Sequence, residues 1–486
     1  MEDNKLVKQV AAALRVSTPL IGIETPDQSA TINLLVQNLN GDRPYLRFDL
    51  SGGLAGINEL GKAEADELAK QAGVQDPSQL VNASETLALA LRLQPRSVLF
   101  VLNSPYLFDS PTAIQAISNL RDQFKSNKRC LVLLGGIIKL PAELQNDIVI
   151  FEEEYPTAAE LQEILLSVYQ PAAEKYNWPG LDGKTLENAI DALRGLPAFL
   201  AEQITAMSLD KERGLDLDSL WQRKIKAIEQ TPGLSVDRGV GGLVNPVGQE
   251  EVMALADGIF TGRQPPKVIV RLDEIDKLFA GMGAKGGPGD SSGVSQDMAG
   301  VFLRAMEDYR WQGLLAKGSP GTGKTLLSKA IGRKYKILSI GADTGAMRGS
   351  LVGQSEAMAR GFVKQVLAIA GEGGALFIAT CNKIDTLPPE VIARFTLGLW
   401  EFDKPDKQAR EGIWLNHLEK YDLNYGLGDL PDDEGWVGRD IRNCCELAWR
   451  MGVSPKQAAR FVGIGGKPLK ASRSTNAAPQ RQVDLG

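Results

Sequence analysis

The feature that most constrains this chain is a glycine-rich turn between an apolar run and a helical pattern, in "GLLAKGSPGTGKTLLSKAIG" (313–332). The apolar residues before the turn predict a β-strand, and the residues after it predict a helix. Gly318, Gly321 and Gly323 let the backbone turn tightly and come close to a bound group. Because the first amides of a helix carry partial positive charge, a strand, glycine turn and helix in this order form a site for phosphate.

Two side chains of this loop have a chemistry of their own. Lys324 is placed to reach the β- and γ-phosphates of a nucleoside triphosphate, and the Thr325 hydroxyl is placed to bind Mg²⁺. The loop residues that we expect to hold the nucleotide are Gly318, Ser319, Pro320, Gly321, Thr322, Gly323, Lys324, Thr325 and Leu326. The bare pattern also arises by chance, but here a strand and a helix flank it as a phosphate loop requires.

A second stretch, "VIVRLDEIDKLF" (268–279), ends an apolar run with adjacent acids. Mg²⁺ prefers oxygen ligands and keeps several waters, so one carboxylate near the phosphates suffices, and Asp273 is the candidate. Glu274 would orient or deprotonate the attacking water. The alternative interpretation is an acidic helix start after a buried strand. Asp276, which completes a D-E-x-D pattern, favours the catalytic interpretation, as does the lack of another such stretch in the second half of the sequence.

Two regions alternate short apolar runs with amphipathic stretches, which predicts parallel α/β sheets. In the first region the strands are expected at 19–24, 45–50, 97–102, 130–136 and 147–152. The expected parts are an α/β module (1–156), a helical subdomain (157–208), a linker with one helix (209–245), an α/β core (246–404), a helical lid (405–463) and a disordered tail (464–486). By element order, the chain repeats one plan: a sheet followed by a helical part.

Composition excludes several classes of function. The net charge of −6 and the pI near 5.3 argue against a broad nucleic-acid surface. A single histidine, His417, excludes a multi-histidine zinc site and a triad built on histidine. The four cysteines lack metal-ligand spacing and are expected to be buried and reduced, as in a cytosolic protein. The N-terminus has no signal-peptide pattern, and no apolar run is long enough to span a membrane.

Five segments together resemble the AAA+ ATPases over roughly residues 240–463. They are "GSPGTGKT" (318–325), "LDEID" (272–276), "LVGQSEAMAR" (351–360), "LFIATCNKIDTLPPEVIARF" (376–395) and "GWVGRDI" (435–441). The resemblance implies a parallel P-loop sheet with a helical lid, Mg²⁺ and ATP as cofactors, and assembly into a ring of identical chains, expected to be a hexamer.

The resemblance also implies roles for residues outside the two acidic and glycine-rich stretches. Asn382 falls at the polar sensor position, and Arg394 at the arginine finger that acts on the ATP of a neighbouring chain in the ring. Arg439 falls near the second sensor position in the lid, with a surface arginine as the alternative. The segment 351–353 falls at the pore loop without the aromatic residue that many substrate-threading members use, and 241–243 resembles the segment that lines the adenine pocket.

The N-terminal half resembles the first module of the AAA protein encoded in cyanobacterial and algal plastid genomes. The resemblance rests on "LPAEL" (140–144), "DIVIFEEEYPTAAEL" (147–161) and "RGLPAFLAEQI" (194–204). This module departs from an active pattern, because no Gly-Lys pair follows its first strand. Asn103 and Ser104 stand where an acidic pair belongs. We therefore expect a degenerate AAA-like module that does not hydrolyse ATP and acts as a scaffold or a docking site.

The order of the motifs is unusual for this family, in which the acidic strand follows the phosphate loop. Here the acidic strand precedes the loop, and "GQSEAMARGFVKQVLAIAGEGGALFIATCN" (353–382) leaves room for one strand, not two. The family sheet has the spatial order 5-1-4-3-2, and right-handed crossovers can reach the same neighbours from a different chain order. The hypothesis is a permuted AAA+ core, which predicts that Asp273 lies close to Thr325.

Three functions are compatible with these features. The first is a ring-forming ATPase of the cytoplasm, or of the plastid stroma in an alga, that remodels a protein partner. The second is a nucleotide switch or scaffold with little turnover. The third is a DNA-associated ATPase of replication or repair, against which the acidic pI counts. No membrane partner is expected.

Overall fold

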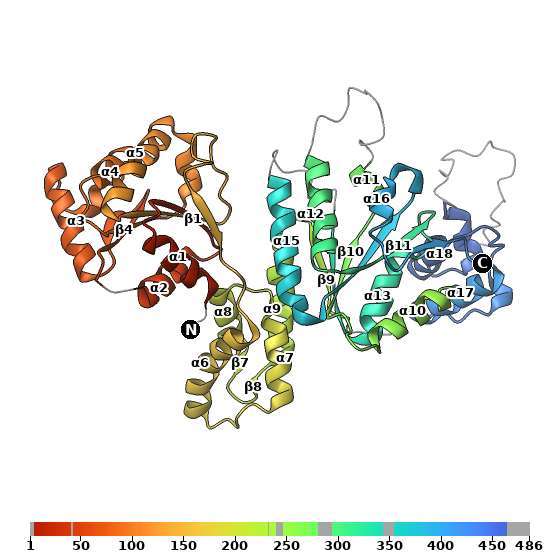
Figure 1. Cartoon of the computed structure of the whole chain (residues 1–486). Helices are drawn as coiled ribbons and strands as arrows, with labels where there is room; N and C mark the ends of the chain where they lie inside the picture. Colours follow the sequence, from red (N-terminus) through yellow and green to blue (C-terminus); the bar gives the residue numbers. More distant parts are fainter. Residues whose placement is uncertain are drawn as a thin grey trace, which may run out of the picture. The chain divides into compact units, whose positions relative to one another are not determined.

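The computed structural model describes residues 4–39, 42–231, 233–239, 246–279, 294–343 and 354–463. The chain divides into two compact units, Met1–Lys224 and Ile225–Gly486 (Figure 1). Three segments discussed above lie outside the described residues: the expected adenine segment 241–243, the pore-loop position 351–353 and the tail 464–486.

The first unit contains a sheet that is parallel except at one edge. Among the described residues its order is β3-β2-β4-β5-β1-β6, and only β3 runs antiparallel to its neighbour. The strands are β1 (Leu20–Glu24), β2 (Tyr45–Asp49), β3 (Gly53–Gly56), β4 (Val98–Val101), β5 (Cys130–Gly135) and β6 (Val149–Glu152). Five of these strands match the expected ranges, and β3 was not predicted from the sequence.

Helices cover both faces of this sheet. Apolar side chains of α1 (Lys5–Arg15) and α2 (Gln28–Asn38) pack on one face. Those of α3 (Glu59–Ala72), α4 (Ala83–Ala90) and α5 (Pro111–Asn127) pack on the other. The connection between β1 and α2 is only three residues long, and Asp27 caps the helix with its own side chain. That connection has no room for a phosphate loop, in agreement with the degenerate sequence.

The rest of the first unit is mainly helical. It contains α6 (Ala158–Tyr176), α7 (Gly183–Leu193) and α8 (Ala198–Met207), followed by the short strands β7 (Leu209–Asp210) and β8 (Gly214–Leu215) and by α9 (Leu217–Glu229), which runs across the boundary between the units. Thr157 and Glu160 form a capping box that starts α6. The segment 209–245, expected to be a linker with one helix, therefore contains α9 together with three short strands, one of which, β9 (Leu234–Asp237), belongs to the second sheet.

The second unit contains the phosphate-loop strand and the acidic strand in one sheet. Its order over the described residues is β14-β11-β13-β10-β12-β9, and only β9 runs antiparallel. The strands after β9 are β10 (Val268–Leu272), β11 (Gln312–Gly318), β12 (Leu338–Ala342), β13 (Ala375–Cys381) and β14 (Leu399–Phe402). The acidic strand β10 lies between β13 and β12, and one strand separates it from β11.

Helices α10 (Glu250–Phe260) and α13 (Lys324–Tyr335) pack on one face of this sheet. The other described helices of the core are α11 (Asp276–Phe279), α12 (Val294–Asp308), α15 (Gln354–Ala370) and α16 (Pro389–Ile392). Phe302 and Phe362 meet edge to face, with ring centroids 5.8 Å apart, and so join α12 to α15.

The lid consists of α17 (Lys407–Lys420), α18 (Gly438–Met451) and α19 (Pro455–Ala458). Its core is built around Trp414, Trp436 and the buried pair Cys444 and Cys445, so these residues pack as the sequence predicts. Short 3₁₀ turns elsewhere in the chain lie at Pro77–Gln79, Ser104–Asp109, Gly371–Gly373, Ile384–Thr386, Leu427–Asp429 and Ala459–Phe461.

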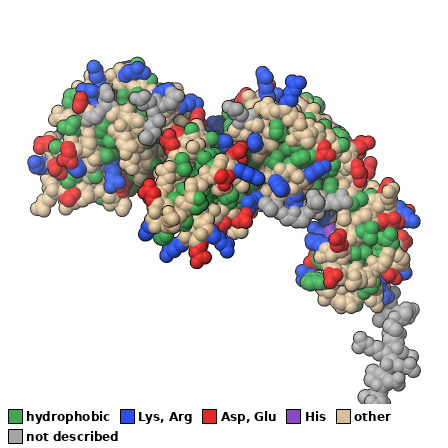
Figure 2. All heavy atoms as spheres, turned by 90° about the horizontal axis from the view of Figure 1, so that it is seen from below, with side chains coloured by type: hydrophobic (Ala, Val, Ile, Leu, Met, Phe, Trp, Pro, Cys, Tyr) green, Lys and Arg blue, Asp and Glu red, His purple; other side chains and the backbone are tan. Residues whose placement is uncertain are grey.

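Surface charges of both signs are interspersed on the face that Figure 2 presents. This distribution agrees with the small negative net charge of the sequence. None of the helices in the described part of the chain is long and apolar enough to cross a membrane.

Candidate nucleotide site

The glycine loop connects the end of β11 to the start of α13, as predicted. Gly321 and Gly323 have φ angles of 94° and 95°, which side-chain-bearing residues rarely adopt. A Cβ at Gly321 would lie 2.8 Å from Cγ2 of Val437, and a Cβ at Gly323 would lie 2.7 Å from Nε2 of Gln249. Both positions therefore need glycine, for the backbone angle and for the space.

Lys324 is the first residue of α13, and its side chain is 7% exposed. Its Nζ donates to the carbonyl oxygens of Gly318 (2.5 Å) and Ser319 (2.9 Å) and to Oδ1 of Asn382 (3.0 Å). Burial lowers the pKa of Lys324, and nearby acids, including Asp276, oppose that shift. The amine is thus held over the loop by neutral oxygens, in a position to exchange them for charged ones.

The two acids lie at the end of β10, beside the first turn of α13. Asp273 Oδ1 accepts a hydrogen bond from Oγ1 of Thr325 at 2.9 Å and one from Oγ1 of Thr380 at 3.3 Å. The proximity of Asp273 and Thr325 expected from a permuted core is therefore observed. Thr380, on β13, also accepts a hydrogen bond from the backbone N–H of Glu274 at 2.9 Å, so it fixes the chain where the strand ends.

Glu274 is connected to the loop through Asn382. Nδ2 of Asn382 donates to Oε1 of Glu274 at 3.2 Å, and Oδ1 of the same amide accepts from Lys324. An ion pair and hydrogen bond with Lys277 lower the pKa of Glu274, and the Asn382 hydrogen bond adds to this effect. The carboxylate is therefore ionised at neutral pH, as a base that accepts a proton must be.

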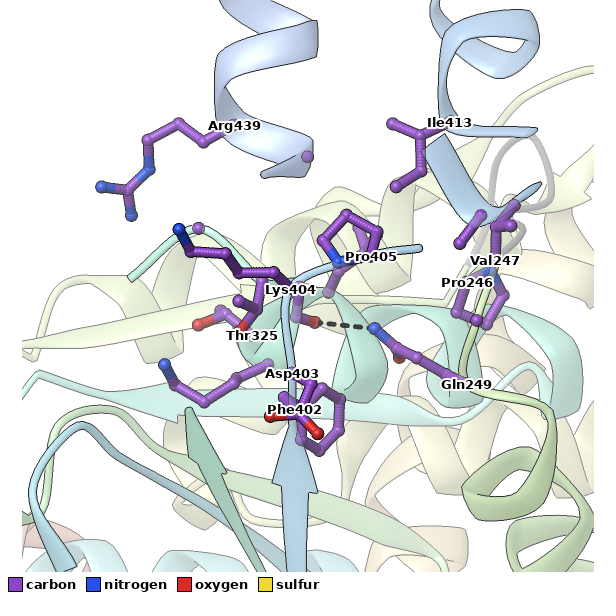
Figure 3. Close-up of a pocket in the computed structure, with 18 of the residues that line it drawn as sticks. Pro246, Val247, Gln249, Thr325, Phe402, Asp403, Lys404, Pro405, Ile413 and Arg439 are labelled. Carbon is purple, nitrogen blue, oxygen red and sulfur yellow. Dashed lines mark hydrogen bonds between the residues drawn. The ribbon is translucent and has the colours of Figure 1, made fainter. Parts of the chain in front are cut away.

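A cavity of about 1050 Å³ opens over the loop. Its lining includes the glycine loop, Asp273, Glu274, Asn382 and residues of the lid. Figure 3 shows how Gln249, from the segment before α10, points toward the loop, while Arg439 extends from α18 of the lid. The cavity is thus formed by three parts of the second unit: the sheet edge, the segment 246–252 and the lid.

Arg439 belongs to this cavity. A Cβ at Gly321 would lie 3.0 Å from Cβ and 3.6 Å from Nε of Arg439, so the arginine lies against the loop. Its charge also contributes to the lowered pKa of Lys324. This position is compatible with a contact to a bound phosphate, and the sensor role remains a prediction.

Arg394 does not line the cavity. Its guanidinium forms an ion pair with Glu307 of α12, with Nη2 and Oε2 2.8 Å apart, and both side chains are exposed. The structure therefore separates Arg394 from the other predicted catalytic residues. An action on a neighbouring chain is compatible with this separation and remains a prediction.

The sequence pattern did not identify three polar or apolar residues of the cavity: Gln249, Ile413 and His417. Oε1 of Gln249 and Nδ1 of His417 are buried without a hydrogen-bond partner. Ile413 and His417 are four residues apart on α17, so they share one face of the lid helix. That spacing, in a chain with a single histidine, is a signal the sequence contains; Gln249 gives no comparable signal.

We expect His417 to make the protein less stable in mild acid. Burial, together with Lys420 and Arg442, lowers the pKa of His417 from 6.5 to about 4. Between these values the unfolded chain takes up a proton that the folded chain refuses, so stability falls as the pH falls. From pH 7.5 to 5, wild type should lose about 2 kcal/mol more unfolding free energy than His417→Gln, measured by denaturant titration. Equal losses in the two proteins would contradict this assignment.

The residues present fit a magnesium nucleotide better than a protein-held metal. No group of three or more His, Cys, Asp or Glu side chains in the described residues could hold a metal ion. One carboxylate and one hydroxyl, Asp273 and Thr325, suit Mg²⁺, which is bound by a few protein oxygens together with phosphates and waters. The donors around the loop and the size of the cavity suit a nucleoside triphosphate.

Comparisons with known proteins agree with this geometry. The model of the N-terminal domain of SpoVK-like AAA ATPases matches residues 6–153, which cover the first α/β module. The AAA domain-containing protein ycf46 of Guillardia theta is 22% identical over 468 residues, which cover 85% of this chain and 80% of that protein.

Two shorter matches involve proteins with other names. The ATP-dependent zinc metalloprotease FtsH 1 of Symbiobacterium thermophilum is 26% identical over 260 residues, 40% of this chain and 43% of that protein. A katanin p60 ATPase-like protein of Xenopus laevis is 30% identical over 156 residues, 28% of this chain and 30% of that protein. The chain thus spans less than half the length of these two relatives. With the two α/β units described above, these similarities establish that the chain belongs to the AAA+ superfamily.

Proposed function

We propose that this chain hydrolyses ATP with Mg²⁺ as an oligomeric AAA+ ATPase and couples hydrolysis to the remodelling of a protein partner. The observation that supports it best is the set of contacts around the glycine loop. Thr325 meets Asp273, and Lys324 meets Asn382, which meets Glu274. These contacts bring the phosphate-binding, metal-binding and water-activating side chains together at one sheet edge.

The residues divide the work of hydrolysis among themselves. Lys324 and the loop amides bind the β- and γ-phosphates, and Thr325 with Asp273 holds Mg²⁺ against them. When bound, Mg²⁺ neutralises charge on the phosphate oxygens. Glu274 accepts a proton from the attacking water, and Asn382 orients Glu274 and the water. Arg439 contributes positive charge from the lid.

The base of the nucleotide belongs between the lid and the segment before α10. Ile413 offers an apolar contact there, and Gln249 and His417 offer unpartnered polar atoms. Because His417 is neutral at pH 7, its Nδ1 can accept or donate a hydrogen bond without a charge. A nucleotide held in this way connects the lid to the core.

The proposed core is a permuted member of its family. Over the described residues, β14, β11, β13, β10 and β12 occupy the spatial positions that the family assigns to strands 5, 1, 4, 3 and 2. The chain reaches them with β10 first. A fold depends on which strands are neighbours, so the permutation leaves Asp273 and Glu274 where their chemistry requires them.

Assembly and partner binding complete the proposal. Arg394 is exposed and lies outside the cavity of its own chain, as an arginine finger of a ring of identical chains would. A hexamer is the expected ring. The first unit has no phosphate loop and no acidic pair, so it is proposed to bind a protein partner or to support assembly.

The test is steady-state release of phosphate from ATP by the purified chain, with Mg²⁺ and with EDTA, at several protein concentrations. Turnover that needs Mg²⁺ and rises per chain with concentration is the expected result. Binding of a fluorescent ATP analogue without turnover would favour a nucleotide switch. Absence of both binding and turnover would reject the proposal.

A further inference from the structure

Arg271 is a charged residue in the middle of an otherwise apolar strand. The strand β10 reads VIVRL, and each of its residues is buried; Arg271 is 8% exposed. A buried charge is costly unless it is paired. Nε of Arg271 lies 3.0 Å from Oδ2 of Asp273, and Nη2 donates to Oγ of Ser235 at 3.0 Å. Each end of this guanidinium therefore has a defined partner.

The three strands at this edge of the sheet provide a path for the arginine. Arg271 on β10 pairs in register with Gly341 on β12, and Gly341 pairs in register with Ser235 on β9. A Cβ at Gly341 would lie 2.2 Å from Nη2 of Arg271 and 2.6 Å from Oγ of Ser235. The side chain of Arg271 thus crosses a strand at the residue that has no side chain, and it ends on the serine beyond.

The consequence appears at Asp273. Its Oδ2 is held by Arg271, and its Oδ1 faces the hydroxyls of Thr325 and Thr380. A carboxylate fixed at one oxygen can rotate little, so the other oxygen stays directed at the hydroxyl of Thr325. The guanidinium also balances the negative charge of Asp273, which weakens the attraction of the site for a bare cation.

We propose that Arg271 is a positioning residue for the magnesium site, anchored by Ser235 across Gly341. It keeps Oδ1 of Asp273 directed at the metal position and makes Mg²⁺ binding depend on the nucleotide, because the Asp273 charge alone is already balanced. This inference rests on the proposed function and assigns a role to a residue outside the cavity. It also gives β9, the antiparallel edge strand, a part in the site.

A purely structural role predicts something different. Replacing a buried ion pair with apolar residues of similar volume is often neutral or stabilising, so the fold does not require the charge. A methionine at 271 would continue the apolar pattern of β10 and fit the same path. The two roles therefore separate when metal dependence and stability are measured on the same variant.

The experiment titrates a fluorescent ATP analogue into wild type, Arg271→Met, Arg271→Lys and Ser235→Ala, with Mg²⁺ and with EDTA, and records thermal unfolding of each. In Arg271→Met the Mg²⁺ concentration for half-maximal nucleotide affinity should rise about tenfold, as when an outer partner of a metal ligand is lost. Affinity in EDTA should stay within about twofold of wild type, because the phosphate loop is untouched. Ser235→Ala, a smaller change, should shift in the same direction by about two- to threefold.

The outcomes are distinguishable. Arg271→Lys retains the charge but cannot reach both partners, so an intermediate Mg²⁺ requirement supports positioning by the fork. Unchanged Mg²⁺ dependence in Arg271→Met and Ser235→Ala, with or without a loss of stability, overturns the inference and leaves the proposed function intact. Wild type that binds nucleotide with no effect of Mg²⁺ overturns both.

Discussion

Glu274→Gln is expected to lower kcat for ATP hydrolysis by about 10²–10³-fold, since general-base catalysis contributes a factor of this size. The substitution preserves shape and the hydrogen bond with Asn382, but an amide cannot take a proton from water. The phosphate loop is unaltered, so nucleotide affinity should stay within about threefold of wild type. Steady-state phosphate release and titration with a fluorescent ATP analogue measure the two effects separately.

The matched control is Glu251→Gln, which removes an exposed carboxylate that lines the same cavity from α10. It changes the net charge equally, and it should leave kcat within about twofold, because Glu251 lies outside the proposed water-binding network. If Glu274→Gln hydrolyses ATP as fast as this control, the strand β10 contributes no catalytic base, and the permuted core loses its main functional support.

The fold could be predicted where the sequence pattern is local. Apolar runs such as 130–136 and 19–24 predict strands buried on both faces, because a parallel sheet covered by helices hides every side chain, and β5 and β1 are buried along nearly their whole length. The start of α13 followed from the glycine loop. The family and the fold class were likewise accessible from the sequence, since a few motifs in fixed surroundings carry them.

Features that depend on distant partners could not be predicted. β3 and β9 are four residues long and pair antiparallel at sheet edges, so their own sequences give little signal. Arg271 interrupted the apolar pattern of the acidic strand, yet its meaning depends on Gly341 and Ser235, which lie far away in the sequence. The cavity residue Gln249 is likewise defined only by what the fold brings next to it.

The position of Asp273 was accessible for a different reason. The sequence order of strands differed from the family pattern, but the neighbours of each strand could be inferred from which motifs must meet. The 2.9 Å contact between Asp273 and Thr325 agrees with that inference. Chemistry thus constrained the topology more strongly than the order of elements did. The catalytic roles of these residues remain for the variants to test.

Arg394→Ala is expected to reduce ATP hydrolysis by about 10³-fold, the low end of what an arginine finger contributes. ATP binding should persist, because Arg394 lies outside the cavity of its own chain. Since the finger is proposed to act on a neighbour, mixing matters. Glu274→Gln retains Arg394, whereas Arg394→Ala retains Glu274, so a mixed ring of two inactive chains contains interfaces with every required group. Phosphate release should therefore recover on mixing and be greatest near equal amounts.

Arg304→Ala is the control, because it removes an exposed arginine from α12, the helix that also carries the ion-pair partner of Arg394, Glu307. It should hydrolyse ATP within about twofold of wild type, as most surface substitutions do. Size-exclusion chromatography with ATP establishes that the mixed chains assemble. Assembled mixtures that stay inactive at every ratio would mean that Arg394 acts within its own chain. An active Arg394→Ala chain alone would exclude a role for this arginine in hydrolysis.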